Sequence, residues 1–352
     1  ALPKYITAIG RITGEYILDI DNLYNIEMSY EENVAAGLVP TTELLYLSRV
    51  PASILSVLMC CALYIICTEE INRFFAITFI SLIIKNATLT RLMVRAMSET
   101  PLLVFSLLSI FFFYRGYRSV SAEKDFHSIY VRQSFYRNLT LSGIMLGLAA
   151  ACKIHAPLIM ASYFLLIFYL LFFHLKSLNR KTQVSILIRS YAVILYPALF
   201  SFTFVHPLAY SNPFKTIAYM LKFRIVDMGL QVEALPGFSN QTILQRCIKI
   251  VSELLNDWAT IQLIPFNILT GITGLLVYGI EGLRYLQQKR NISLFLLMPF
   301  SFLPLIASAL MSPLNYPRYF LIPIFTVVFI SSRGFTGIVE WLLMNLQRLQ
   351  LH

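Results

Sequence analysis

Residues 50–67 read VPASILSVLMCCALYIIC, a run without a single charged side chain. A helix needs about 20 predominantly apolar residues to cross the hydrocarbon core of a bilayer, within a range of about 17–25. Because comparable runs recur along the chain, the sequence predicts an all-α, polytopic integral membrane protein. We expect about nine spans, with a further partial element at the membrane interface over 335–346. The expected spans are 50–67, 74–90, 101–114, 139–152, 156–174, 186–206, 260–280, 293–311 and 319–332.

The composition of the whole chain excludes a soluble protein. Of its 352 residues, 57% are hydrophobic and only 13% are charged, and the mean hydropathy is +0.69. Soluble domains carry about 25% charged residues. The net charge of +10 arises mainly from short basic segments between apolar runs, which is typical of cytoplasmic loops. A nucleic-acid-binding surface would gather its charge differently, and we expect no nucleic-acid partner.

The basic connections also predict which segments face which side of the membrane. The most basic are 115–138, 175–185 and 281–292. If all three are cytoplasmic, an even number of spans must separate each pair, and two expected spans do so in both cases. The two long segments, 1–49 and 207–259, then lie outside the cytoplasm. The chain is therefore expected to form one transmembrane domain, 1–352, with two extracytoplasmic segments.

Each long segment contains a stretch with the period of an amphipathic helix. Lys4 to Gly14 is expected to lie along the membrane interface, and Ile243 to Leu255 is expected to lie over the outer mouth of the bundle. The five cysteines contain no CxxC pair, and the histidines lack metal-ligand spacing. Neither residue type therefore predicts a metal site or a disulfide framework.

Ionisable side chains at span ends are informative because they are costly in a bilayer unless they are paired or solvated. Arg91, Arg95 and Glu99 are spaced by four and share one face if the segment is helical. They form either a salt-bridged stripe that anchors the span end, or a site in which arginines hold an anion and the carboxylate acts chemically.

A second group of costly side chains lies at two other predicted outer connections. Lys153 and His155 lie between two spans, and SPLNYPRYFLIP (312–323) places Tyr316 and Arg318 at another. A lysine that snorkels to the interface and an aromatic–basic belt are the structural alternatives. Arginine also binds anions through paired hydrogen bonds. Because all these groups map to one side, they favour a site for a lipid-linked anionic substrate over an ion path.

Six segments along the chain carry a family resemblance. They are LPKYITAIG (2–10), LSRVPASILSVLMCCALYII (47–66), RAMSETPLLVFSLLSIFFF (95–113), LSGIMLGLAAACKIHAPLIM (141–160), HPLAYSNPF (206–214) and PRYFLIPIF (317–325). In this order and sidedness the chain resembles the GT-C membrane glycosyltransferases of the protein O-mannosyltransferase and lipid A aminoarabinose transferase type, similar to glycosyltransferase family 39. The resemblance covers nearly the whole chain.

The resemblance implies an enzyme of the plasma membrane or endoplasmic reticulum membrane. It would transfer a sugar from a polyprenyl-phosphate donor to a protein or glycolipid acceptor on the extracytoplasmic side. Glu99 matches the acid of the family's second loop and is the predicted catalytic residue. A divalent metal bridging Glu99 and the phosphate stays an open expectation, although no ligand spacing requires one. The predicted substrate-binding residues are Lys4, Arg91, Arg95, Lys153, His155, Tyr316 and Arg318.

One departure from the family pattern concerns its main catalytic aspartate. That residue lies in the first outer loop, before the segment where this chain begins, and Asp19 and Asp21 do not occupy its place. We expect either an N-terminal truncation, which is inactive as it stands, or a degenerate relative. The rival functions are a transporter or flippase of lipid-linked glycans, and a non-catalytic subunit in which Glu99 pairs with basic groups and leaves no cavity.

Overall fold

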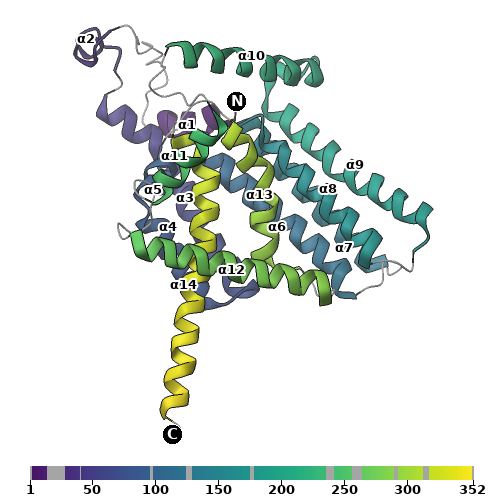
Figure 1. Ribbon diagram of the computed structural model, residues 1–352. Coiled ribbons are helices and arrows are strands. Elements are labelled where there is room, and N and C mark those ends of the chain that lie inside the picture. The colour runs from purple at the N-terminus through teal and green to yellow at the C-terminus, as the bar shows by residue number, and fades with distance from the viewer. Residues whose placement is uncertain are drawn as a thin grey trace.

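The expected all-helical architecture is confirmed. The computed structural model describes residues 2–13, 28–39, 41–95, 98–123, 129–174, 178–234, 242–255, 264–288, 292–311 and 317–350, and these residues contain helices and no strand (Figure 1). The α-helices are α1 (Leu2–Thr13), α2 (Tyr30–Ala35), α3 (Thr42–Glu70), α4 (Arg73–Lys85), α5 (Ala87–Met93), α6 (Glu99–Glu123), α7 (Ile129–Cys152), α8 (Ile159–Tyr169), α9 (Arg180–Val205), α10 (Pro213–Ala234), α11 (Ile243–Leu255), α12 (Ile264–Gln288), α13 (Leu294–Met311) and α14 (Leu321–Gln350). Short helical turns η1 (Ala156–Leu158), η2 (Leu170–His174), η3 (Pro207–Ala209) and η5 (Pro317–Phe320) adjoin them.

Within the described residues, 7 helices are long and apolar enough to cross a membrane, or 8 if α4 and α5 together form one span. The nine expected spans are therefore not confirmed as such. The difference concerns two of them. The expected span at 74–90 is a pair of helices bent by 79°, and the one at 139–152 is the apolar half of α7, whose first half carries Arg132 and Arg137. The seven are Thr42–Glu70, Glu99–Val120, Ala156–Phe173, Arg180–Val205, Pro265–Gln287, Leu294–Met311 and Arg318–Gln347.

The break between α4 and α5 is built so that its exposed backbone groups find partners. The buried Asn86 caps α5, because its Oδ1 accepts a hydrogen bond from the Leu89 N–H at 2.8 Å. The Thr90 hydroxyl donates to the Ile84 carbonyl, near the end of α4, at 3.0 Å. Broken helices are tolerated at membrane depth only when such groups are satisfied within the protein.

Glycines bring two pairs of helices into backbone contact. On α7, a Cβ added at Gly147 would lie 2.1 Å from the Ala198 carbonyl oxygen of α9, and one at Gly334 on α14 would lie 1.9 Å from the Thr270 carbonyl oxygen of α12. Small residues permit this approach between helices in membranes, where close packing is a main source of association. Both crossings therefore depend on the absence of a side chain.

The long helices meet around an aromatic core. Phe79 on α4 packs edge-on against Phe325 and Phe329 of α14, with ring centroids 5.5 and 5.0 Å apart. Phe302 of α13 adds a further ring, 6.3 Å from Phe325. This core separates the two ends of the bundle. At one end α6 and α14 begin and α13 ends, and at the other α13 begins and α12 ends.

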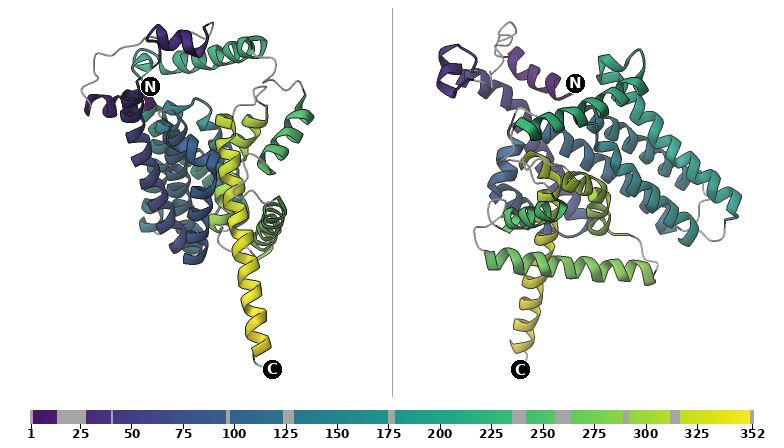
Figure 2. Two further views of the ribbon diagram at one scale, coloured as in Figure 1. Left: turned by 90° about the vertical axis from the view of Figure 1, so that its left-hand side faces the viewer. Right: turned by 45° about the horizontal axis from the view of Figure 1, so that its top comes forward.

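The figures show how the outer helices are placed relative to this bundle. In Figures 1 and 2, α10 runs across one end, α12 crosses α14 instead of running alongside it, and the last part of α14 projects past the other helices. The expected partial element at 335–346 is thus continuous with α14. Its apolar side chains, including those of Trp341 and Leu343, are exposed.

Both expected amphipathic helices form, as α1 and α11. The position of the second differs from the prediction. α11 lies against the side of α13, where Arg246 donates to the Met311 carbonyl at 2.8 Å. The helix that reaches over the end of the bundle is α10, which the sequence analysis did not predict.

Candidate functional site

A cavity of about 570 Å³ opens at the end of the bundle where α6 begins. Its volume lies within the range of about 300–1,000 Å³ that is usual for small-molecule sites. Its walls are formed by the ends of α7 and α13 and by the beginnings of η5 and α14, and α10 lies above it. The polar lining residues are Ser98, Glu99, Lys153, His155, Ser308, Arg318 and Tyr319.

An ion pair between Glu99 and Lys153 forms the floor of this cavity. The Lys153 Nζ lies 3.1 Å from Glu99 Oε1. Glu99 is the first residue of α6, and Lys153 directly follows the last residue of α7. The partial positive charge at a helix N-terminus and the partial negative charge at a C-terminus favour this placement of a carboxylate and an ammonium group. Local helix geometry therefore supports both charges.

The second carboxylate oxygen of Glu99 is not satisfied within the described residues. The residue is only 2% exposed, and its Oε2 has no hydrogen-bond partner. More than about 90% of buried polar atoms in proteins have a partner, and exceptions call for an explanation such as a bound molecule or a catalytic role. Because Glu99 lines the cavity, a ligand bound there would lie beside this carboxylate.

Two cations approach the ring of Tyr319. Lys153 Nζ lies 5.7 Å from the ring centroid and the Arg318 guanidinium carbon lies 5.3 Å from it. Arg318 Nη2 also donates to the Tyr319 hydroxyl in a long hydrogen bond of 3.5 Å. Cation–π attraction within about 6 Å of a ring holds such groups in place. Tyr319 thus gathers two positive charges beside one carboxylate.

The roof of the cavity is apolar and comes from α10. Leu221, Ile225 and Met228 line the cavity, and their spacing of four and three places them on one helical face. No helix was expected here, because within 207–259 only Ile243 to Leu255 was predicted to be helical. The signal was nevertheless present, since Asn212 caps the helix (the Lys215 N–H donates to its Oδ1 at 2.9 Å) and Pro213 follows at the first helical position.

The structure brings four of the predicted site residues together, namely Glu99, Lys153, His155 and Arg318. Three others are not among the described residues that line the cavity, and these are Lys4, Arg91 and Arg95. Tyr316 lies outside the described residues. Tyr319, which was not among the predicted site residues, also lines the cavity.

The predicted helical stripe of Arg91, Arg95 and Glu99 is wrong. α5 ends at Met93 and α6 begins at Glu99, so the three residues do not share one helix. The ends of the two helices are tied instead through the Met93 carbonyl, which accepts hydrogen bonds from Ser56 at 2.8 Å and from Thr100. Glu99 is thereby separated from the arginines and paired with Lys153.

The described residues do not fit the divalent metal that was left open. No group of three or more His, Cys, Asp or Glu side chains among them could hold a metal ion. Glu99 is the one carboxylate in the described lining of the cavity, and an ammonium group lies 3.1 Å from it. That ammonium group repels a metal cation and attracts an anion. The arrangement therefore suits an anionic ligand together with a second molecule that carries a hydroxyl group.

In comparisons with known proteins, no family model, no curated protein and no solved structure matches the chain.

Proposed function

We propose that this protein is a GT-C-type membrane glycosyltransferase that uses a polyprenyl-phosphate-linked sugar as donor. The observation that carries the proposal is the cavity in which a half-satisfied buried carboxylate lies beside Lys153 and Arg318. Two cations suit the donor phosphate, and the face of α10 with Leu221 and Ile225 suits the first part of its lipid chain. The predicted sidedness places this site outside the cytoplasm.

In the proposed reaction Glu99 is the proton acceptor. A hydroxyl of the protein or glycolipid acceptor attacks the anomeric carbon of the sugar, and its proton passes to the Glu99 carboxylate. A new carbon–oxygen bond forms as the bond between the anomeric carbon and the phosphate oxygen breaks. The electron pair leaves with the polyprenyl phosphate, and Lys153 and Arg318 stabilise the added negative charge.

Lys153 has two anionic partners in this scheme. Without substrate it pairs with Glu99 at 3.1 Å. A phosphate between Lys153 and Arg318 competes for the same ammonium group, which weakens its hold on Glu99. The carboxylate then becomes a better acceptor for the hydroxyl proton when the donor is in place.

The two rival functions have less support. A transporter needs a polar path between the ends of the bundle, whereas the described helices pack Phe79, Phe325 and Phe329 between them. A purely structural subunit would pair its charges and leave no cavity. Glu99 and Lys153 do pair, but the cavity is present and Glu99 Oε2 has no hydrogen-bond partner among the described residues.

The test is transfer of radiolabelled sugar from a polyprenyl-phosphate donor, measured in membranes that contain the full-length gene product. We expect label to reach an acceptor with the wild-type protein, and we expect Glu99→Gln to abolish it. Glu43→Gln is the matched control, because Glu43 is an exposed carboxylate on α3 that is not among the described residues lining the cavity. It should retain wild-type transfer.

A second assay distinguishes a flippase from a transferase. Liposomes that contain the purified protein and a fluorescent lipid-linked sugar report movement of the donor across the bilayer. Movement without transfer would overturn the proposed enzyme, and transfer that survives in Glu99→Gln would remove Glu99 from the reaction.

A further inference from the structure

A second hollow, of about 740 Å³, lies along the beginning of α9. It is independent of the cavity at Glu99, because it begins with the first residue of α9 while the cavity lies beyond that helix's other end. Its described lining comes from α9: Arg180 and Lys181 lie in the first turn, Val184, Ser185 and Ile188 follow, and Arg189 lies about 12 Å further along the helix than Lys181.

The positive charges of this hollow have no ion-pair partner in the part of the chain that the structure describes. No carboxylate among the described residues forms an ion pair with Arg180, Lys181 or Arg189. Arg189 is oriented by a hydrogen bond with the Tyr136 hydroxyl on α7, and a fourth cation, Arg132, interacts with the same hydroxyl. Basic side chains from α9 and α7 therefore lie along this part of the structure, and no described carboxylate pairs with those of α9.

Apolar side chains in the same hollow indicate what kind of anion fits. Val184 is 44% exposed and Ile188 is 65% exposed. Both lie on α9, a helix apolar enough to cross a membrane, and they follow its basic first turn. A soluble anion gains nothing from these two side chains, whereas a lipid places its phosphate near the first turn and an acyl chain along the helix.

We propose that this hollow binds an anionic phospholipid of the cytoplasmic leaflet. The head-group phosphate lies beside Arg180 and Lys181, one acyl chain runs along Val184 and Ile188, and Arg189 adds positive charge to the same hollow. The predicted sidedness places 175–185 in the cytoplasm, and the cytoplasmic leaflet carries the anionic lipids that attract basic segments. The site requires neither the proposed transferase activity nor the cavity at Glu99.

The experiment compares lipid binding to the purified full-length protein by native mass spectrometry, with phosphatidylglycerol and phosphatidylcholine as probes. We expect phosphatidylglycerol to bind more tightly than phosphatidylcholine, and added salt to remove that preference. The variant Arg180→Gln/Lys181→Gln/Arg189→Gln should lose about 100-fold in phosphatidylglycerol affinity, because each basic residue contributes about a factor of five near an anionic surface.

Three exposed arginines outside the hollow supply the matched control. Arg73→Gln/Arg115→Gln/Arg284→Gln removes the same charge from positions outside the described lining of the hollow, and it should keep wild-type affinity. Equal losses in both triple variants would overturn a defined site and leave only non-specific attraction. Retention of phosphatidylglycerol by the first variant would overturn the proposal outright.

Two further measurements keep the test decisive. The variant Val184→Thr/Ile188→Thr keeps every charge. It should weaken the binding of phosphatidylglycerol and leave any binding of glycerol 3-phosphate unchanged. Competition by glycerol 3-phosphate at concentrations similar to the lipid's would assign the hollow to a soluble phosphate and contradict the lipid assignment. If the triple variant fails to fold, Arg180→Gln alone, at an exposed position, should give about a fivefold loss.

Discussion

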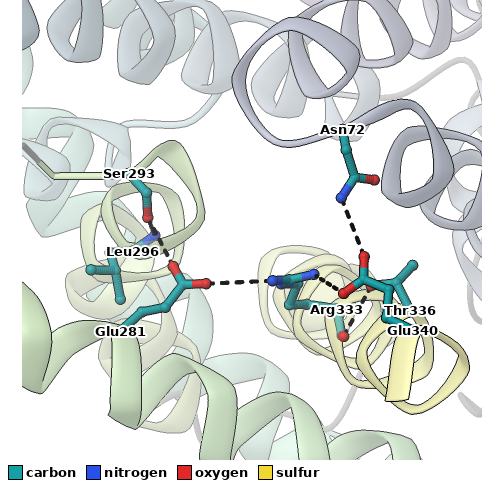
Figure 3. A network of polar contacts seen from close by, with 7 residues as sticks. All are labelled: Asn72, Glu281, Ser293, Leu296, Arg333, Thr336 and Glu340. Atoms are coloured by element: carbon teal, nitrogen blue, oxygen red, sulfur yellow. Dashed lines mark hydrogen bonds and ion pairs between the residues drawn. The ribbon is translucent and has the colours of Figure 1, made fainter. Parts of the chain in front are cut away.

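Charged groups occur at both ends of the helical bundle, but they are organised differently. At the end shown in Figure 3, Arg333 of α14 lies between Glu281 of α12 at 3.8 Å and Glu340 at 3.4 Å. Each carboxylate also has a neutral partner, because Ser293 donates to Glu281 at 3.2 Å and Asn72 donates to Glu340 at 3.5 Å. At the cavity end, Glu99 has one ionic partner and one oxygen with none.

The difference lies in the carboxylates and distinguishes a stabilising network from the proposed binding site. The network of Figure 3 joins α4, α12, α13 and α14 and gives each carboxylate an ionic and a neutral partner, although Arg333 Nε has no hydrogen-bond partner among the described residues. A buried carboxylate oxygen without a partner lowers the free energy of unfolding, because its desolvation is not compensated. Such an arrangement persists at functional sites, where a ligand supplies the missing partner. The comparison can be broken or sharpened by substitutions at the two ends.

The largest effect is expected when one carboxylate is neutralised at each end. Glu99→Gln keeps the size of the side chain and removes the proposed proton acceptor, so the proposed sugar transfer should fall by about 10²–10⁴-fold. Glu281→Gln makes the same change in the network of Figure 3 and should leave the rate of transfer unchanged while lowering the melting temperature. Single-turnover rates and thermal melts of both variants make the measurement. Equal rates in the two variants would contradict the distinction.

The second prediction concerns stability at the cavity end. Lys153→Met leaves Glu99 buried without its cation and should lower the free energy of unfolding by about 3 kcal/mol. Glu99→Met/Lys153→Met replaces the pair by apolar side chains and should recover stability to within about 1 kcal/mol of the wild type, because removing both charges removes both desolvation costs. The recovered protein should be inactive. A double variant less stable than the single one would show that the pair is structural.

The crossing of α12 and α14 offers a stability test beside the Figure 3 network. Gly334→Ala places a Cβ 1.9 Å from the Thr270 carbonyl oxygen and 2.6 Å from the Gly274 nitrogen. The helices must move apart, and we expect a loss of about 2–3 kcal/mol in the free energy of unfolding. Gly337→Ala is the control on the same helix, since its Cβ meets only Val277 Cγ2 at 3.9 Å, and should change stability by less than about 0.5 kcal/mol.

Hydropathy predicted the helices of this molecule more reliably than it predicted their breaks. The runs that became α3 and α13 are recognisable because about 18 consecutive residues avoid charge. The break at Asn86 is invisible to hydropathy, since IIKNATL reads as a continuation of its span. It is decided by side chains that satisfy the backbone locally, namely Asn86 and Thr90.

The candidate site shows the same difference. The sequence indicates which residues are costly to bury, and only the contacts in the fold show which of them pair. Sequence reasoning found Glu99, Lys153 and Arg318 because ionisable groups at span ends are costly wherever they lie. It could not pair Glu99 with Lys153, since they begin and end different helices 54 positions apart. The equal spacing of Arg91, Arg95 and Glu99 was misleading because a helix boundary falls between them.

The smallest expected effect concerns His206, which lies between α9 and η3 at the base of the roof helix α10. It is 6% exposed, stacks on Phe202 with ring centroids 5.2 Å apart, and its Nδ1 has no hydrogen-bond partner. Burial lowers the pKa of His206 below its ordinary value of 6.5. In the window just below pH 6.5 the unfolded state therefore binds the proton more readily, and stability should fall as the pH is lowered toward the folded-state pKa.

His206→Phe should remove this pH dependence. The resulting change in the slope of stability against pH should be smaller than about 1.4 kcal/mol per pH unit, the limit for one proton. At neutral pH the variant should be as stable as the wild type, or more stable by about 1 kcal/mol, because an unpaired buried nitrogen is replaced by carbon. Phe202→Leu is the control, since it disturbs the same contact and keeps the titrating group. Thermal melts across the pH range make the measurement. If His206→Phe kept the wild-type slope, the pH dependence of stability would come from another group and not from this imidazole.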